Sequence, residues 1–268
     1  MISIITENKL KKYIKNALRV VLVTALWVFV WDVLAVLLSR DNELMLLLLP
    51  RPVTVFEKWL EIAFTKEFLS AVMSSVLRIM SGFIIGSVIG FAAGVLTYSV
   101  KLADWILAPI FKMIRAVPVV AITILFFSLF KSDRLPVVIV TLMVIPLIWA
   151  TVHDGLGNKN NELFEMAKLY RLSPKKYFFN IQLPSLTPSL LTASVNALGL
   201  AWKSGIAAEV ISEPNVALGT ILMEGKGMID FSSVYAVTLT VVILSLVIEI
   251  LLKGICKRTV GKGRDLNA

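Results

Sequence analysis

The stretch ELFEMAKLYRLSPKKYFFNIQLP, residues 162–184, is polar and rich in helix-forming residues, yet it lies between two long apolar runs. The apolar residues of its first half recur at i, i+3, i+4 and i+7 and so share one face of a short helix: Leu163, Met166, Ala167 and Tyr170. Ser173 and Pro174 then favour a second helix, because serine caps free amide groups and proline suits a first helical turn. We therefore expect a helix, a sharp turn and a second short helix through Phe179, ending at Leu183 and Pro184.

The rest of the chain is strongly apolar. Of its 268 residues, 57% are hydrophobic and 17% charged, with a mean hydropathy of +0.84, whereas soluble domains carry about 25% charged residues. Six apolar runs come near the roughly 20 residues that a helix needs to cross a bilayer core: residues 20–38, 79–100, 117–130, 135–152, 189–211 and 234–252. We expect an all-α membrane protein with about six transmembrane helices.

Charge is distributed unevenly between the loops. Lysine and arginine gather in the tail 1–19, between the second and third runs, in the loop 153–187 and in the tail 253–268, whereas the alternate loops are balanced or acidic. By the positive-inside rule we expect both tails and the loop 153–187 to be cytoplasmic, and residues 20–252 to form the transmembrane domain. The net charge of +9 then reflects topology, since nucleic-acid binding would require the basic residues on one folded surface.

Glycine recurs at every fourth position of the second run: Gly82, Gly86, Gly90 and Gly94. On a helix these residues form a nearly continuous smooth stripe, which lets another backbone approach closely. The stripe fits a helix-packing seam that slides or rocks during function, and it equally fits static packing. In both cases we expect this helix to lie inside the bundle.

The segment 162–184 resembles the EAA loop of ABC importer permeases, whose pattern is E-A-A, three residues, G, nine residues, I, one residue and L-P. The positions that match are Glu165, Ala167, Ile181, Leu183 and Pro184, while Met166 stands at the first alanine and Arg171 at the usual glycine. The arginine matters, because glycine at a helix C-terminus relieves a left-handed conformation that costs other residues about 1 kcal/mol. The resemblance implies that this loop docks into a groove of an ATPase, with Leu163, Met166 and Tyr170 as anchors.

Three further stretches resemble the taurine, alkanesulfonate and nitrate branch of these permeases: residues 49–55 as L-P-x-P-x-x-V, 115–118 as R-x-I/V-P, and 199–211 as the fifth span. The resemblance implies a type I ABC importer permease fold with its core at 69–252, in a bacterial inner membrane. It also implies two copies of a cytoplasmic ATPase that uses ATP and Mg²⁺, a second permease subunit in a homodimer, and an extracytoplasmic substrate-binding protein. The chain lacks a G-x-x-x-x-G-K-[ST] sequence, so we expect it to be non-catalytic and to bind no cofactor itself.

Lys203 and Glu209 are ionisable residues within the fifth run. Intramembrane charge is costly and usually faces protein or water. Lys203 is therefore interpreted either as a positive charge on the path of an anionic solute or as a structural partner of Glu209 or Asp32. Glu209 lies nearer the outer end and fits a gate on the same path. The resemblance adds that the solute is of the sulfonate, nitrate or vitamin-precursor class.

Two other functions are open at this stage, an ion-coupled secondary transporter and a membrane-embedded enzyme. A secondary transporter normally shows inverted repeats or paired broken helices, and the sequence has no convincing repeat. An enzyme would need several polar groups converging at one depth, and Asp32, Lys203 and Glu209 are few. The single histidine, His153, has no ligands at zinc-site spacing, so we expect no metal site.

Overall fold

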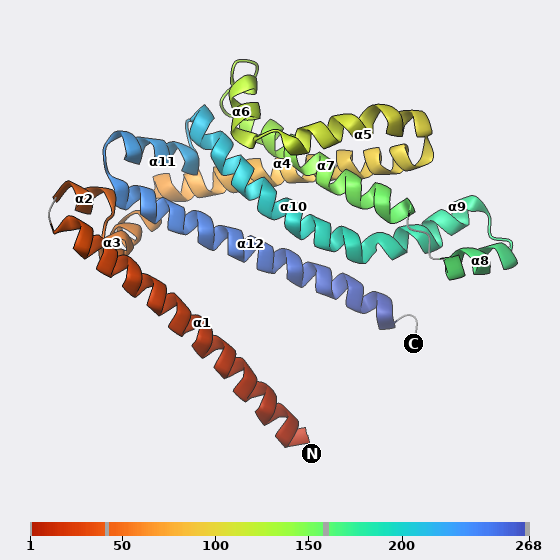
Figure 1. Ribbon diagram of the computed structural model, residues 1–268, viewed down its shortest axis with the longest axis horizontal. Coiled ribbons are helices and arrows are strands. Elements are labelled where there is room, and N and C mark those ends of the chain that lie inside the picture. Colours follow the sequence, from red (N-terminus) through yellow and green to blue (C-terminus); the bar gives the residue numbers. More distant parts are fainter. Residues whose placement is uncertain (1, 41–42, 158–160, 266–268) are drawn as a thin grey trace. The chain divides into compact units, whose positions relative to one another are not determined.

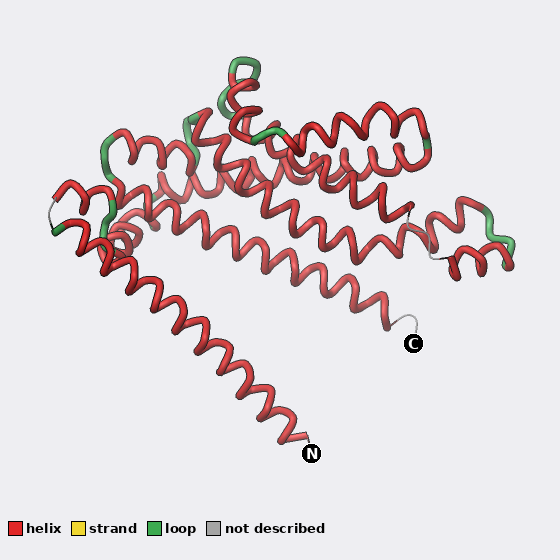
Figure 2. The backbone as a smooth tube through the Cα atoms, viewed as in Figure 1, coloured by secondary structure: helices red, strands yellow, loops and turns green. Residues whose placement is uncertain are grey.

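The computed structural model describes residues 2–40, 43–157 and 161–265, and within these ranges every regular element is a helix (Figure 2). The expected all-α class is therefore confirmed. The chain divides into two compact units, residues 1–64 with 224–238 and residues 65–223 with 239–268. Figure 1 labels the helices in chain order.

Three helices open the first unit: α1 (Ile2–Ser39), α2 (Glu43–Leu48) and α3 (Pro52–Ala63). The second unit contains α4 (Lys66–Ser99), α5 (Lys101–Ala116), α6 (Val119–Phe127), α7 (Leu135–Gly157), α8 (Asn161–Leu169), α9 (Pro174–Tyr177), the π-helical turn η1 (Phe178–Gln182) and α10 (Leu183–Ser212). The last two helices, α11 (Leu218–Gly227) and α12 (Phe231–Asp265), contribute residues to both units.

Four of the described helices are long and apolar enough to cross a membrane: residues 18–39 of α1, α4, α7 and residues 231–254 of α12. α5 and α6 make a fifth span if the pair, bent by 102°, crosses together. The bend falls at Val117 and Pro118, because the residue before a proline avoids helical dihedral angles. The expected count of about six was therefore not exact: the third apolar run is a nine-residue helix, and α10 is long enough but carries too many small and polar residues.

The glycine stripe of α4 is buried against α7: Gly82, Gly86, Gly90 and Gly94. A Cβ atom at Gly90 would come within 2.7 Å of the Ile145 carbonyl oxygen, and one at Gly94 within 2.6 Å of Val152 Cβ. Both distances are shorter than van der Waals contact, so the two backbones approach this closely only because the side chains are absent. The Thr141 hydroxyl of α7 also donates a hydrogen bond to the Gly82 carbonyl oxygen at 3.2 Å. The α4–α7 pair is the centre of the second unit.

α10 packs one face against this pair. A Cβ atom at Gly205 would lie 2.6 Å from Ile79 of α4 and 3.0 Å from Val140 of α7. Trp202 lies beside that glycine, and its indole Nε1 donates to the Val241 carbonyl oxygen of α12 at 3.0 Å. These contacts bury one side of α10 and leave its other side, which includes Lys203, exposed in the single chain.

In the first unit α1 is scarcely covered, since only 6% of its apolar window is buried. Its carboxylate Asp32 accepts two hydrogen bonds from the Arg51 guanidinium, at 2.9 and 3.0 Å. The indole ring of Trp31 packs on Tyr235 with ring centroids 5.5 Å apart. Asp32 thus has a partner, Arg51, within its own unit.

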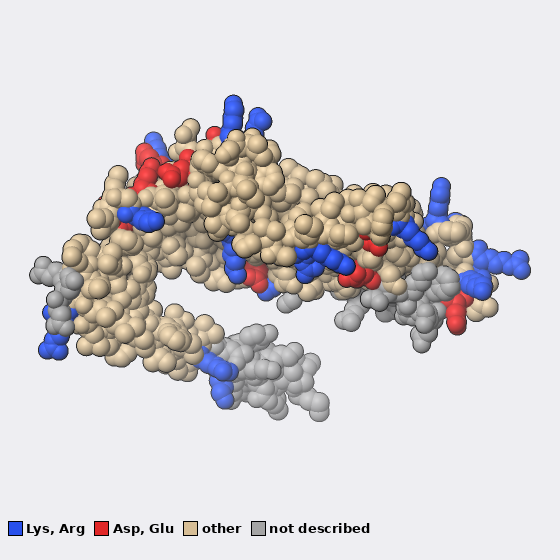
Figure 3. All heavy atoms as spheres, turned by 45° about the horizontal axis from the view of Figure 1, so that its top comes forward, with Lys and Arg blue, Asp and Glu red and all other residues tan. Residues whose placement is uncertain are grey.

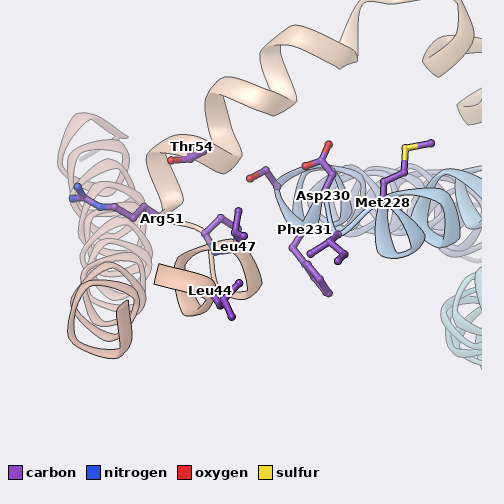
Figure 4. A pocket seen from close by; sticks show the side chains of 10 residues that line it. Leu44, Leu47, Arg51, Thr54, Met228, Asp230 and Phe231 are labelled. Atoms are coloured by element: carbon purple, nitrogen blue, oxygen red, sulfur yellow. The ribbon is translucent and has the colours of Figure 1, made fainter. Parts of the chain in front are cut away.

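A cavity of about 810 Å³ lies in the first unit between α2, α3 and the start of α12 (Figure 4). Leu44, Leu47 and Phe231 supply apolar walls, and Asp230 supplies a carboxylate that caps α12. Burial alone would raise the pKa of Asp230, but hydrogen bonds from Ser233 and the nearby positive charge of Lys58 outweigh it and hold the pKa below its usual range.

Candidate functional site

The segment that links α7 to α10 begins with α8, whose end has a specific hydrogen-bonded form. The Leu172 amide donates to the Ala167 carbonyl oxygen at 3.0 Å, and the Arg171 amide donates to the Lys168 carbonyl oxygen at 3.1 Å. Arg171 has a φ of 51°, in the left-handed region. This is the Schellman arrangement, in which the left-handed position is usually glycine. The turn therefore keeps the geometry of a glycine-terminated helix with an arginine at its strained position.

The turn is followed by a second helical start, as expected from Ser173 and Pro174. The Ser173 hydroxyl accepts a hydrogen bond from the Lys176 amide at 3.4 Å, and Pro174 is the first residue of α9. The helix does not end at Leu183 and Pro184 as expected, because α9, η1 and α10 run on without a break. Pro184 has no N–H and its ring crowds the carbonyl group four residues earlier, and the π-helical turn just before it accommodates the mismatch.

Apolar side chains project from this segment. Tyr170 is 76% and Leu169 82% exposed, Met166 is 41% exposed, and Glu165 is exposed beside them. Ala167 is buried at the turn, whereas the side chain of Leu163 lies outside those that the structure describes. Exposed aromatic and aliphatic groups in a polar segment are typical of a surface that another protein covers.

The end of the segment is anchored to the bundle. Gln182 is buried, and its amide nitrogen donates to the Tyr98 hydroxyl of α4 at 3.2 Å and to the Leu156 carbonyl oxygen of α7 at 3.3 Å. Ile181 and Leu183 on either side are half-buried, and Pro184 is exposed. Burial, with the adjacent Tyr98, raises the pKa of the Tyr177 hydroxyl. Hydrogen bonds thus tie the end of this segment to α4 and α7, and η1 continues directly into α10.

Basic side chains surround the same segment. Lys168, Arg171, Lys175 and Lys176 are all exposed, and Figure 3 shows lysine and arginine at the end of the second unit that carries α8 and α9. Glu165 is the described acidic side chain among them. The surface thus combines apolar anchors with a positive rim, which suits an acidic or polar protein partner.

Lys203 and Glu209 lie on one helix but point in different directions, since six residues rotate an α-helix by about 240°. Lys203 is exposed, and no hydrogen bond or ion pair of its side chain occurs within the described part of the chain. Glu209 is completely buried. The structure therefore does not bring these two residues together, and their pairing was the wrong alternative.

Glu209 is held by three donors from two helices of the second unit, α4 and α11. Its carboxylate accepts from the Ser75 hydroxyl at 2.7 Å, the Gly219 amide at 3.3 Å and the Arg78 guanidinium at 3.4 Å. The Gly219 amide belongs to the first turn of α11, where the helix dipole favours a negative charge. A Cβ at Gly219 would come within 2.4 Å of Glu209 Cβ, so glycine is needed for this contact.

Arg78 extends the network to the surface. Its guanidinium also donates to the Val216 carbonyl oxygen and to the Asp133 carboxylate, both at 2.8 Å. Asp133 lies between α6 and α7 and is 57% exposed, whereas Arg78 is 16% exposed. We call Ser75, Arg78, Asp133 and Glu209 the polar clamp. Of these four residues, only Glu209 was predicted from the sequence. The position of Arg78 at the start of an apolar run could have indicated that it pairs with a buried acidic residue.

His153 lies near the α8 end of α7 and stacks on Trp149 with ring centroids 5.7 Å apart. Its two ring nitrogens lie 3.3 Å from Asp104 of α5 and 3.2 Å from Asp154. Each carboxylate meets a different nitrogen, so the three groups surround no common point. Among the residues that the structure describes, no group of three or more metal-binding side chains converges.

A family profile described as binding-protein-dependent transport system inner membrane component matches residues 82–260. The bicarbonate transport system permease protein CmpB of Synechocystis is 28% identical over 57% of this chain, and the match spans about half, 55%, of that relative. The nitrate import permease protein NrtB of the same organism is 25% identical over 74% of each chain.

Another relative and a solved structure are also similar to this chain. A Bacillus subtilis protein named as an aliphatic sulfonates transport permease, SsuC, is 25% identical over 70% of this chain and 68% of its own length. Among solved structures, one of the methionine ABC transporter MetNI in inward-facing conformations has a TM-score of 0.61 and 18% identity, and the match covers 71% of this chain and 94% of that chain. At this identity the likeness is one of fold, and the fold is that of a type I ABC importer permease.

Proposed function

The chain belongs to the family of binding-protein-dependent transport system inner membrane components, and from this premise we propose that it forms the path of an ATP-driven importer for a small anion. Its partners would be two copies of a separate ATPase, which bind ATP and Mg²⁺, a second copy of this chain and an external binding protein. Both termini and the α8–α9 segment would face the cytoplasm. Family membership disfavours the ion-coupled transporter and the membrane enzyme.

One observation carries the ATPase contact: the α8–α9 segment exposes apolar anchors while its far end is tied into the bundle. Met166, Tyr170 and Leu169 are free to enter a groove on the ATPase, with Glu165 beside them. The Gln182 hydrogen bonds then connect that surface to α4 and α7. Closing of the ATPase pair would push this segment, and the push would reach α10 through η1 without an intervening flexible loop.

The solute proposal rests on Lys203. A cationic amine on an exposed helix face cannot remain at bilayer depth against lipid without a large cost, so it faces water, protein or solute. Its two candidate acidic partners are engaged by Arg51 and Arg78. The relatives named for nitrate, bicarbonate and aliphatic sulfonates act on anions or sulfonates, which supports an anionic solute here. Glu209, being saturated with donors, would fix the helix ends beside the path and would not itself bind solute.

The test is uptake of labelled nitrate, bicarbonate and a short alkanesulfonate into vesicles that hold the complete transporter. Lys203→Met should lower uptake of the transported anion at least about tenfold, roughly 1.4 kcal/mol of lost stabilisation, while Lys203→Arg keeps most of it. Lys226→Met, at an exposed lysine of α11, is the matched control and should transport normally. Normal uptake by an assembled Lys203→Met transporter would exclude Lys203 from the path.

A further inference from the structure

A shallow groove of about 450 Å³ runs over α7 and α10 on the same side of α10 as Lys203. Leu147 and Pro188 are apolar parts of its lining, and the other lining residues are small or carry a hydroxyl or amide group: Thr151, Ser189, Thr192, Ala193 and Asn196. All of these residues belong to the second unit, and those of α10 come from its first half. The groove was not recognised in the sequence, because serine, threonine and asparagine in an apolar run fit packing equally well.

The groove and Lys203 form one line along α10. Thr192, Asn196, Gly199 and Lys203 stand at i, i+4, i+7 and i+11, which is a straight stripe on an α-helix. Thr192, Asn196 and Lys203 are exposed, and a Cβ added at Gly199 would meet no atom within 4 Å. Gly199 itself is half-buried. The stripe is therefore made of polar or small residues, and its three side chains are uncovered within the described structure.

Lipid cannot cover this stripe without cost. The Thr192 and Thr151 hydroxyls donate to carbonyl oxygens one turn back, at 3.1 and 3.0 Å, and so have local partners. The Asn196 amide has no hydrogen-bond partner among the described residues. An unpaired amide and a lysine in hydrocarbon are both strongly disfavoured, so the stripe faces water or protein.

The position of the groove suggests its use. Its α10 residues, 188–196, lie between Lys203 and the start of α10, which joins η1. Figure 1 shows α9 and α8 beyond that end of α10. Asn196 is seven residues from Lys203, or about 10 Å along the helix at 1.5 Å per residue. An anion that leaves the Lys203 amine therefore meets the amide and hydroxyl groups of the groove after moving about 10 Å along the helix.

We propose that this groove is the exit route by which an oxyanion passes from Lys203 to the α8–α9 side, hydrogen-bonded in turn by Asn196, Thr192 and Thr151. The inference rests on the proposed function. Neutral donors bind an anion more weakly than lysine does, and conduction requires sites weak enough for the solute to leave. In the assembled transporter the same groove of a second copy would close the route from the other side.

Charged thiol reagents test this route without knowledge of the natural solute. In a Cys256→Ser background, Asn196→Cys in membrane vesicles is treated with an anionic or a cationic methanethiosulfonate. Leu246→Cys, at a 54% exposed apolar position of α12, is the control. We expect Asn196→Cys to react and Leu246→Cys to remain unlabelled. Adding Lys203→Met should lower the ratio of anionic to cationic labelling rates about tenfold, the effect of one charge at about 10 Å in a partly shielded site.

Failure to label Asn196→Cys with either reagent would overturn the route, because the groove would then be covered. If the ratio of anionic to cationic labelling rates were the same with and without Lys203, the role of the groove in carrying anions would be overturned.

Uptake by the intact transporter separates this inference from the proposed function. The pair Asn196→Leu and Thr192→Val should lower the maximal uptake rate several-fold with little change in half-saturating concentration, while Thr238→Val, another exposed threonine bonded one turn back, should not. Loss of uptake in Lys203→Met with normal rates in the pair would retain the anion path and reject the exit route.

Discussion

Among the residues that the structure describes, three other than glycine adopt left-handed dihedral angles, which strain the backbone: Arg171, Glu213 and Ile229, with φ of 51°, 44° and 60°. Each follows the end of a helix. Ile229 is the most unusual, because a β-branched side chain crowds the backbone in this conformation. The Asp230 amide nevertheless donates to the Gly225 carbonyl oxygen at 2.8 Å, which completes the helix-ending turn. The fold thus requires the left-handed conformation at positions where the side chain opposes it.

Replacement by glycine should relieve this strain. Ile229→Gly should raise the free energy of unfolding by up to about 1 kcal/mol, because the gain of roughly 1–2 kcal/mol from relieved strain is partly offset by the greater freedom of glycine in the unfolded chain. Arg171→Gly should act in the same direction. Thermal unfolding in detergent measures both, and a lower midpoint in either variant would contradict the strained turn. Gly254→Ala, at an open position inside α12, is the reverse control and should be neutral or stabilising.

At the scale of elements, the α4–α7 seam depends on the absence of side chains. Gly90→Ala should lower the free energy of unfolding by about 1–3 kcal/mol, because its Cβ would lie 2.7 Å from a backbone oxygen that cannot turn away. The midpoint of thermal unfolding, read beside that of Gly254→Ala, separates crowding from helix propensity. A Gly90→Ala protein as stable as the wild type would show that the helices can move apart at no cost.

The polar clamp joins α4, α10, α11 and the α6–α7 connection by bonds of unequal strength. Arg78→Ala should cost about 3–5 kcal/mol of stability, because it leaves the buried Glu209 carboxylate without its cation. Asp133→Asn should cost less than about 1 kcal/mol, because that carboxylate is largely exposed to solvent. Thermal unfolding of both variants ranks them, and equal losses would show that the clamp has no buried centre.

At the scale of the whole molecule, the features predictable from sequence are those coded by neighbouring residues. The length of the apolar runs was sufficient to predict the all-α membrane class. The spacing from Glu165 to Pro184 was sufficient to predict the family, which the profile match confirms. The glycine spacing predicted that α4 lies inside the bundle, and Ser173 predicted where α9 begins. All of these signals lie within a few helical turns of chain.

The features that escaped prediction depend on residues far apart in the chain. Arg78 meets Asp133 across 55 positions and Glu209 across 131, and neither distance leaves a pattern in one sequence. The predicted number of membrane spans was inexact for a related reason. One side of α10 is covered by neighbouring helices and the other carries small polar groups, so α10 is less apolar than a lipid-facing helix. The groove beside Lys203 likewise needed α7 to be in place.

The central claim, that this permease couples to a separate ATPase through the α8–α9 segment, is tested most directly by co-purification from native membranes in detergent. A tagged wild-type chain and a Glu224→Arg control, altered at an exposed glutamate of α11, should retain an ATPase, whereas Glu165→Arg should lose it while remaining folded. A folded wild-type chain that never retains an ATPase, or a Glu165→Arg chain that retains it fully, would contradict the account.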